Sequence, residues 1–162
     1  MEAQKQLKWE GKAIGRLKNG IKAESVWPLL EDFCSIHKWL PTINTCYQVE
    51  GVYGQPGLVR YCGKEIKNNS VMTSQWCHEK LIAMDPVVRC LSYEVLENNM
   101  GFKSYIATIK LATISSDADE NGCQIEWSFL ADPVEGLSCE VLLSYLKLAL
   151  KGMVKNVERA LL

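Results

Sequence analysis

The feature that most constrains the fold is a change of hydrophobic period near residue 137. Before that point, apolar and polar residues alternate in several segments, as in strands with one buried face. After it, apolar residues recur every three or four positions with lysines between them, which indicates one amphipathic helix over 137–161. The apolar face expected for this helix comprises Leu137, Val141, Leu142, Tyr145, Ala149, Gly152, Met153 and Val157.

The segments before residue 137 predict seven strands and two short helices. In the first strand, Trp9, Gly11 and Ala13 share one face, while charged residues share the other. An apolar stretch over 26–39 then has helical spacing that is broken near Asp32 and stopped by Pro41, so we expect two short helices there. Turn-rich stretches separate the further strands, which are expected at 45–51, 57–64, 70–84, 88–96, 103–114 and 122–131.

This order of elements is that of a helix-grip fold, an α+β architecture in which a curved seven-stranded antiparallel sheet wraps around a long C-terminal helix. Nothing in the composition marks a linker, so we expect one domain over residues 1–162. Ala149 and Gly152 are small residues on the apolar face of the helix, which is consistent with a cavity of a few hundred Å³ between helix and sheet. A tight helix crossing without a void accounts for them equally well.

Two ionisable residues interrupt the apolar faces of the predicted strands. Arg60 alternates with Leu58 and Cys62, and Glu79 alternates with Leu81 in a later strand. A charge among apolar residues is costly unless it is paired or functional. Because a guanidinium can hold a polarised oxygen and a desolvated carboxyl can exchange a proton near neutral pH, the two residues predict an acid/base site. A structural ion pair in the core is the alternative.

The same alternation assigns polar residues to the wall of that site. If the inner faces of the strands coincide, Gln75, Tyr93 and Tyr105 lie around Arg60 and Glu79. Trp127 alternates with polar neighbours in the seventh strand and is expected in the wall or the core. The residues expected on the inner face of the 70–84 strand include Gln75, Cys77, Glu79, Leu81 and Ala83.

Charge and motifs argue against several classes of function. The net charge is −1, with Lys and Arg scattered along the chain, so we expect no nucleic acid and no anionic membrane as partner. The first residues lack the apolar core of a secretory signal, and Lys147 interrupts the last apolar stretch, which predicts a cytoplasmic protein without a membrane span. Nucleotide-binding and hydrolase motifs do not occur, and no cofactor is expected.

Cysteine and histidine usage predicts neither disulfides nor a metal site. The seven cysteines include no C-x-x-C pair, which is typical of reduced thiols that serve as small apolar residues. His37 and His78 are the only histidines, and neither has a second ligand at metal-binding spacing.

Several segments together carry a family resemblance. They are W-E-G-K at 9–12, W-P-L-L-E-D-F and I-H-K-W-L-P within 27–41, G-L-V-R-Y at 57–61, W-C-H-E-K-L-I-A-M-D at 76–85, and E-W-S-F followed by V-E-G within 126–136. This set resembles the plant lachrymatory factor synthase-like proteins. They belong to the START-like superfamily, which includes birch-pollen allergens, polyketide cyclases and abscisic acid receptors. The receptor strings S-G-L-P-A and H-R-L do not occur here, which disfavours a hormone-receptor role.

The resemblance implies roles for the two ionisable residues. In that family, the onion enzyme rearranges 1-propenesulfenic acid by moving a proton from oxygen to carbon, with an essential arginine and glutamate that fall on Arg60 and Glu79. Glu79 would then relay the proton while Arg60 holds the sulfur-bound oxygen. The resemblance also places Tyr93 and Tyr105 in the wall as hydrogen-bonding residues.

Two positions depart from that enzyme. Gln75 and Ala149 fall where it has larger aromatic residues, which implies a wider or more polar cavity and a different natural substrate. A small isomerase or cyclase without a cofactor, acting on a small hydrophobic substrate, is therefore one expected function. A non-catalytic carrier or sensor of a small hydrophobic metabolite or lipid is a second, and a structural role with a filled interior is a third.

Overall fold

The computed structural model describes residues 7–68, 71–116 and 119–162, which form one antiparallel sheet, two α-helices and one 3₁₀ helix. In chain order the elements are β1 (Trp9–Arg16), α1 (Ala23–Glu31), η1 (Phe33–Lys38), β2 (Thr45–Glu50), β3 (Val59–Asn68), β4 (Val71–Asp85), β5 (Cys90–Asn98), β6 (Tyr105–Ser116), β7 (Asp119–Ala131) and α2 (Cys139–Leu161).

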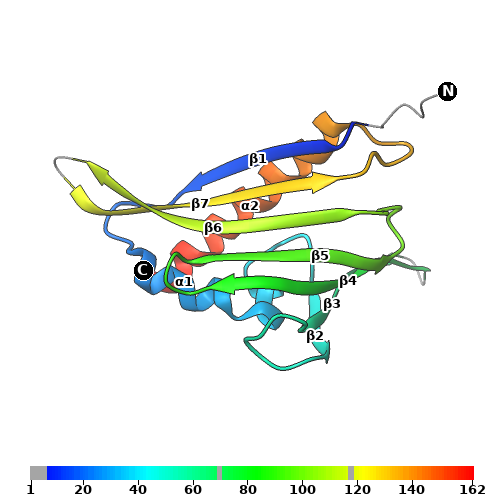
Figure 1. The fold of residues 1–162 in the computed structure, drawn as a ribbon, viewed down its shortest axis with the longest axis horizontal. Helices are drawn as coiled ribbons and strands as arrows, with labels where there is room; N and C mark the ends of the chain where they lie inside the picture. Colours follow the sequence, from blue (N-terminus) through cyan, green and yellow to red (C-terminus); the bar gives the residue numbers. More distant parts are fainter. Residues whose placement is uncertain (1–6, 69–70, 117–118) are drawn as a thin grey trace.

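Strands β2 to β7 form an antiparallel meander, and β1 pairs with the last strand of that meander. Strands β2 to β7 lie side by side in chain order and β1 pairs with β7, so that β1 and β2 are the two edges of the sheet. In Figure 1, α2 crosses behind β1, β7 and β6, while α1 lies on the same side near one end of the sheet. The α+β class and the helix-grip fold predicted from the order of elements are confirmed.

Alternation along the strands separates a buried inner face from an outer face. In β1, Ala13 is buried whereas its neighbour Ile14 is exposed. Ala13 lies opposite Trp127 in β7, and Trp127 lies opposite Ile109 in β6, so a row of inward side chains runs across three strands. Because successive residues point to opposite faces, each such row gives α2 an apolar surface to pack against.

The helical stretch after β1 is broken where the sequence predicts. Asp32 has φ −72° and ψ 79°, which ends α1, and η1 begins at the next residue. The indole Nε1 of Trp39 donates a hydrogen bond to the carbonyl oxygen of Leu29 over 3.1 Å, and this bond folds the second segment back on the first. The break determines the direction in which Phe33, the first residue of η1, enters the interior.

Several strand bounds differ from the predicted ones, and two departures have a clear local cause. β5 begins at Cys90 rather than at residue 88, because Val88 belongs to a turn in which Arg89 adopts a φ of 55°. Ala83 is exposed rather than inward, because the β4–β5 register shifts between Leu81 and Ala83. The extra residue of such a bulge reverses the alternation that follows it.

The buried face of α2 differs from the prediction at its first turns. Val141 and Tyr145 are 41% and 60% exposed. Each precedes a buried leucine, so each lies about 100° around the helix from the buried stripe. The buried residues of α2 are Leu142, Leu146, Ala149, Leu150, Met153, Val154 and Val157.

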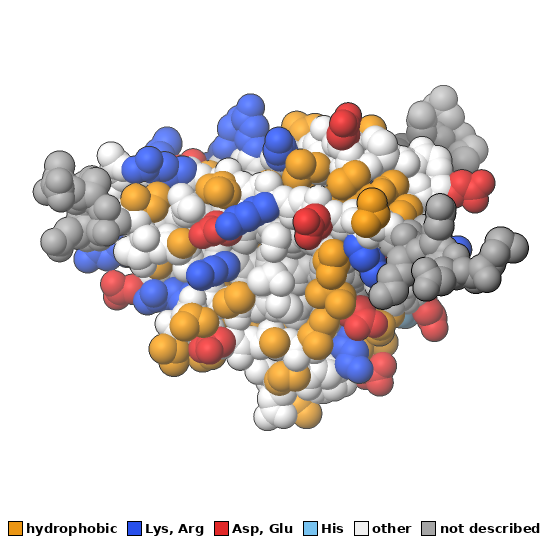
Figure 2. Space-filling model, turned by 45° about the horizontal axis from the view of Figure 1, so that its top comes forward, with side chains coloured by type: hydrophobic (Ala, Val, Ile, Leu, Met, Phe, Trp, Pro, Cys, Tyr) orange, Lys and Arg blue, Asp and Glu red, His pale blue; other side chains and the backbone are white. Residues whose placement is uncertain are grey.

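Within the described part of the chain, no helix has the length and apolar character needed to cross a bilayer. The face drawn in Figure 2 carries basic and acidic side chains close to one another, with hydrophobic side chains between them.

Candidate functional site

Arg60 and Glu79 lie directly opposite each other on β3 and β4. The Nε of Arg60 donates a hydrogen bond to Oε1 of Glu79 over 2.9 Å, and Nη2 forms an ion pair with the same oxygen at 2.7 Å. The Arg60 side chain is 4% exposed and that of Glu79 is 12% exposed, so the ion pair is nearly enclosed. The sequence predicts that Arg60 and Glu79 face the same interior from neighbouring strands and contact each other. The structure shows this contact.

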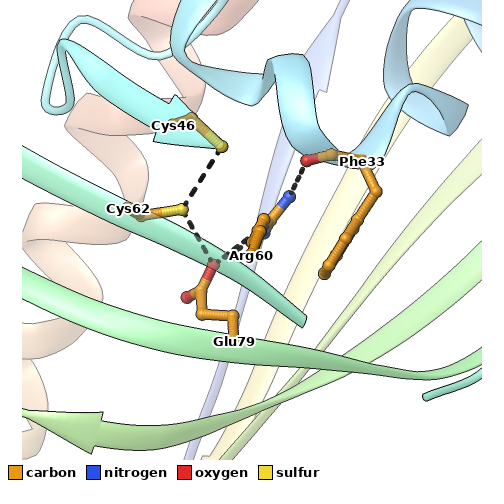
Figure 3. A network of polar contacts seen from close by, with 5 residues as sticks. All are labelled: Phe33, Cys46, Arg60, Cys62 and Glu79. Carbon is orange, nitrogen blue, oxygen red and sulfur yellow. Dashed lines mark hydrogen bonds and ion pairs between the residues drawn. The ribbon is translucent and has the colours of Figure 1, made fainter. Parts of the chain in front are cut away.

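The guanidinium of Arg60 is also held by η1 and by two aromatic rings. Nη1 donates to the carbonyl oxygen of Phe33 over 2.7 Å, as Figure 3 shows. The Cζ atom lies 3.7 Å from the centre of the Phe33 ring and 4.9 Å from the centre of the Tyr93 ring. Hydrogen bonds and ring contacts therefore fix the orientation of the charged group in the interior.

The electrostatic environment gives Arg60 and Glu79 different protonation states near neutral pH. Burial raises the pKa of Glu79 to about 7, although the Arg60 charge opposes that rise. Burial is the largest influence on Arg60 and disfavours its charge. The Glu79 carboxylate, with smaller contributions from Cys62, Tyr93 and Cys46, outweighs burial and raises the pKa of the guanidinium. Near neutral pH, Arg60 stays charged while Glu79 divides between its two protonation states.

The two tyrosines of the predicted site are buried on neighbouring strands. Tyr93 of β5 contacts the Arg60 guanidinium, and Tyr105 of β6 stacks on Phe129 with 5.7 Å between the ring centres. Burial raises the pKa of both phenols, and the Glu79 charge adds to that effect. Both therefore remain neutral hydroxyl groups that can donate a hydrogen bond.

The other three predicted wall residues occupy different environments. Trp127 is 6% exposed, and its buried indole nitrogen lies near the Tyr93 hydroxyl without a hydrogen bond of acceptable geometry. Ala149 is buried on α2. Gln75 is exposed on β4, opposite Lys64, and is not brought to the Arg60–Glu79 pair.

The sequence reasoning missed the contributions of η1 and of the cysteines. The Phe33 carbonyl that binds Arg60 is a backbone group, which no side-chain pattern reveals. The Cys62 thiol donates to Oε1 of Glu79 over 3.5 Å, and the sulfurs of Cys62 and Cys46 are 3.8 Å apart (Figure 3). Alternation places Cys62 on the same inner face of β3 as Arg60, but only the β2–β3 register brings Cys46 next to Cys62.

A hollow of about 620 Å³ lies away from this pair. It is open and formed mainly by outward-facing side chains of β1, β6 and β7. Its lining comprises Glu10, Gly11, Lys12, Ile106, Thr108, Ser128, Phe129 and Leu130. The rings of Phe33 and Tyr93 lie against the Arg60 guanidinium, and the enclosed cavity expected between helix and sheet remains a prediction. Among the described residues, no three His, Cys, Asp or Glu side chains are grouped so that they could bind a metal ion.

Comparison with known proteins places this site in a family context. Residues 20–161 match the family model described as polyketide cyclase / dehydrase and lipid transport. The protein XoxI from Bacillus cereus has a similar structure, with a TM-score of 0.69 and 22% identity over 93% of this chain and 94% of that chain. The structure of a Bacillus thuringiensis protein without a known function gives a TM-score of 0.68 and 22% identity over 93% and 97% of the two chains. Ginseng major latex-like protein 151 from Panax ginseng gives a TM-score of 0.65 and 16% identity, over 94% of this chain and 97% of that chain.

Proposed function

Because the chain belongs to the polyketide cyclase / dehydrase and lipid transport family, we propose that it binds a small hydrophobic substrate beside Arg60 and Glu79 and moves a proton on it. The observation that carries this proposal is the buried pair itself. A carboxyl whose pKa is about 7 contacts an enclosed guanidinium, in a fold that otherwise buries apolar residues. Such perturbed ionisable groups cluster at functional sites.

Glu79 is the acid/base in this proposal. Its Oε1 accepts hydrogen bonds from Arg60 and Cys62, whereas the second oxygen points away from both (Figure 3). A group whose pKa lies near the working pH can accept a proton from the substrate and return it to another atom. The second oxygen is therefore the atom assigned to proton transfer.

Arg60 holds a polarised oxygen of the substrate. Each of its terminal nitrogens has a second N–H for which the described residues provide no acceptor. These two N–H groups, together with the hydroxyl groups of Tyr93 and Tyr105 and the indole N–H of Trp127, can stabilise charge that develops on that oxygen. Rearrangement of a sulfenic acid, as in lachrymatory factor synthase, is a reaction of this kind. Substrate access requires Phe33 to move, since its ring lies on the guanidinium.

A non-catalytic carrier is the second candidate. The two hydrogen bonds, the ion pair and the two ring contacts of Arg60 make it a rigid anchor for a polar head group, without any need for proton transfer. Ala149 contributes to the apolar wall in both proposals. Gln75 is exposed, so it would contact only a ligand that reaches the surface.

Turnover and binding assays separate the two candidates. We expect wild-type protein to rearrange 1-propenesulfenic acid generated in situ, and Glu79→Gln to lose about 10²- to 10⁴-fold in rate, the usual contribution of general acid/base catalysis. Glu94→Gln, which makes the same change on β5, is the matched control and should retain activity. Binding of the fluorescent probe anilinonaphthalene sulfonate is measured in parallel, below the unfolding temperature of each variant.

The outcomes distinguish the proposals. An active wild type with a fully active Glu79→Gln variant would disprove proton transfer by Glu79. A wild type that binds the probe but never converts the sulfenic acid would make the carrier the better description for this substrate.

A further inference from the structure

Three cysteines occupy neighbouring register positions on the inner side of the sheet, beside the ion pair. Cys62 on β3 lies opposite Cys46 of β2 on one side and opposite Cys77 of β4 on the other. The sulfurs of Cys46 and Cys62 are 3.8 Å apart, and either can donate a proton to the other (Figure 3). Proton transfer on a substrate by Glu79 does not use this group of thiols.

We propose that Cys46 and Cys62 are a site of oxidative modification, at which a hydroperoxide joins their sulfurs in a disulfide. Directly opposite residues of antiparallel strands have Cα atoms about 4.5 or 5.5 Å apart. Both separations lie within the range of about 4.4–6.8 Å that a disulfide spans. The bond therefore requires rotation of the two side chains and no separation of β2 from β3.

Access from solvent favours oxidation of the Cys46–Cys62 pair over oxidation of the Cys62–Cys77 pair. Cys46 is half-buried on β2, the edge strand of the sheet, whereas Cys62 and Cys77 are 3% and 6% exposed. An oxidant from solvent enters past Cys46 at the edge of the sheet, and Cys62 is the sulfur in contact with Cys46. Cys77 lies on the far side of Cys62 from the edge.

The local charges favour a thiolate within the group. Hydrogen bonds from the Cys46 and Cys77 thiols, together with the Arg60 charge, lower the pKa of Cys62 and raise the pKa values of its two donors. These directions place the charge on Cys62, with the Cys46 thiol as a donor to it. Since the thiolate is the nucleophile, the group is prepared for oxidation.

The chemistry balances in two steps. The Cys62 thiolate attacks one peroxide oxygen, so that an S–O bond forms, the O–O bond breaks and an alkoxide or hydroxide leaves. The released oxygen anion takes the proton of the Cys46 thiol. The resulting Cys46 thiolate attacks the Cys62 sulfenic sulfur, an S–S bond forms and hydroxide departs. Each oxygen anion takes up one of the two protons lost by the thiols. Two thiols are thereby oxidised by two electrons and the peroxide is reduced.

The modification would also change the ion pair. The Cys62 thiol donates to Oε1 of Glu79, and a disulfide sulfur has no proton to donate. Oxidation would therefore leave Arg60 as the remaining partner of that oxygen. The disulfide itself does not depend on whether Glu79 transfers protons, so its test is independent of the proposed function.

Peptide mapping tests the proposal. Reduced protein is treated with hydrogen peroxide, its remaining thiols are alkylated, and it is digested with trypsin without reduction. Cys46 and Cys62 then lie on separate peptides, 39–60 and 61–64. We expect these peptides to be linked, lighter by two hydrogen atoms than their sum, and two of the seven thiols to be lost. Dithiothreitol should restore both thiols.

Variants and alternative products make the test decisive. Cys46→Ser, on the edge strand, should abolish the link, whereas Cys90→Ser, which replaces another half-buried cysteine, should retain it. Oxidation should raise the thermal unfolding midpoint of the wild type and of Cys90→Ser, but not that of Cys46→Ser. A link between 61–64 and 68–80, a link between two chains, or oxidation to sulfinic acid without a link would overturn the proposal.

Discussion

At the scale of single residues, one buried arginine determines the character of the interior. Among the residues whose burial is described, Arg60 is the charged residue in the buried class, and its partners come from three elements. β4 supplies the carboxylate, η1 supplies the Phe33 carbonyl and ring, and β5 supplies the Tyr93 ring. An enclosed ion pair of this kind contributes little net stability, but removal of one partner leaves an uncompensated charge. The interior therefore depends on the ionisation of Glu79.

This dependence predicts how stability varies with pH. The folded pKa of Glu79 is about 7, above its ordinary value of 4.5. The folded state thus keeps a proton that the unfolded state has lost, so this contribution is complete below about pH 4.5 and disappears as the pH rises through 7. The difference in unfolding free energy between wild type and Glu79→Gln, from urea titrations, should fall by about 3 kcal/mol across that interval.

Glu126→Gln provides a control of opposite sign. A hydrogen bond from Lys12 lowers the pKa of Glu126 on the outer face, so its contribution is present at neutral pH and is lost as the medium becomes acidic. If the Glu79 difference stays flat between pH 4.5 and 7, the carboxyl does not have the raised pKa on which the proton-transfer proposal depends.

At the scale of elements, glycines determine how closely α2 lies on the rest of the fold. A Cβ atom at Gly15 of β1 would be 2.7 Å from Cγ2 of Val154, so the missing side chain lets the helix approach the strand. At Gly152 of α2, a Cβ atom would be 2.5 Å from Cγ of Pro41. Gly152 therefore accommodates the chain after η1 and does not leave a cavity.

Gly152→Ala should destabilise the protein, although alanine is favoured over glycine in helices by about 1 kcal/mol. The added methyl group meets the rigid Pro41 ring, and overpacking of this kind costs about 1–3 kcal/mol. Ser144→Ala, at an exposed position of the same helix, should change the unfolding free energy by less than about 0.5 kcal/mol. Urea unfolding of both variants is the measurement. Stabilisation by Gly152→Ala would show that Pro41 can retract.

At the scale of the whole molecule, the C-terminal helix α2 connects the sheet to the segments near Lys18 and Trp39 in one core. The Lys18 backbone N–H donates to Oε2 of Glu158 over 2.7 Å, and Nδ2 of Asn156 donates to the carbonyl oxygen of Trp39 over 2.9 Å. The buried side chains of α2 belong to the same core cluster as those of α1 and the strands. The sheet thus depends on the last element of the chain to cover its inner face.

A chain that ends at residue 138 should therefore lose its tertiary structure. Without α2, the inner face exposes apolar side chains, so we expect a non-cooperative thermal transition and strong binding of anilinonaphthalene sulfonate, as in a molten globule. The full-length variant Leu148→Ser, which replaces a 66% exposed residue of α2, should unfold as cooperatively as wild type. Cooperative unfolding of the shortened chain, without dye binding, would show that the sheet is stable alone.

The sequence by itself determined the elements of this fold and the inward direction of Arg60 and Glu79. These properties follow from periods of two and about 3.6 residues, which are local and can be read without knowing any distant contact. The break at Asp32 is local for the same reason, because it depends on the backbone of a few adjacent residues.

Only the tertiary structure decided which of these residues meet. The bulge after Leu81 turns Ala83 outward, the β2–β3 register brings Cys46 to Cys62, and the Phe33 carbonyl reaches an arginine 27 residues away. Each of these outcomes depends on strand register, or on the path of a loop between distant segments. A one-residue slip reverses a face or replaces a partner while the hydrophobic pattern of each segment stays the same, so the pattern alone does not select among the possible contacts.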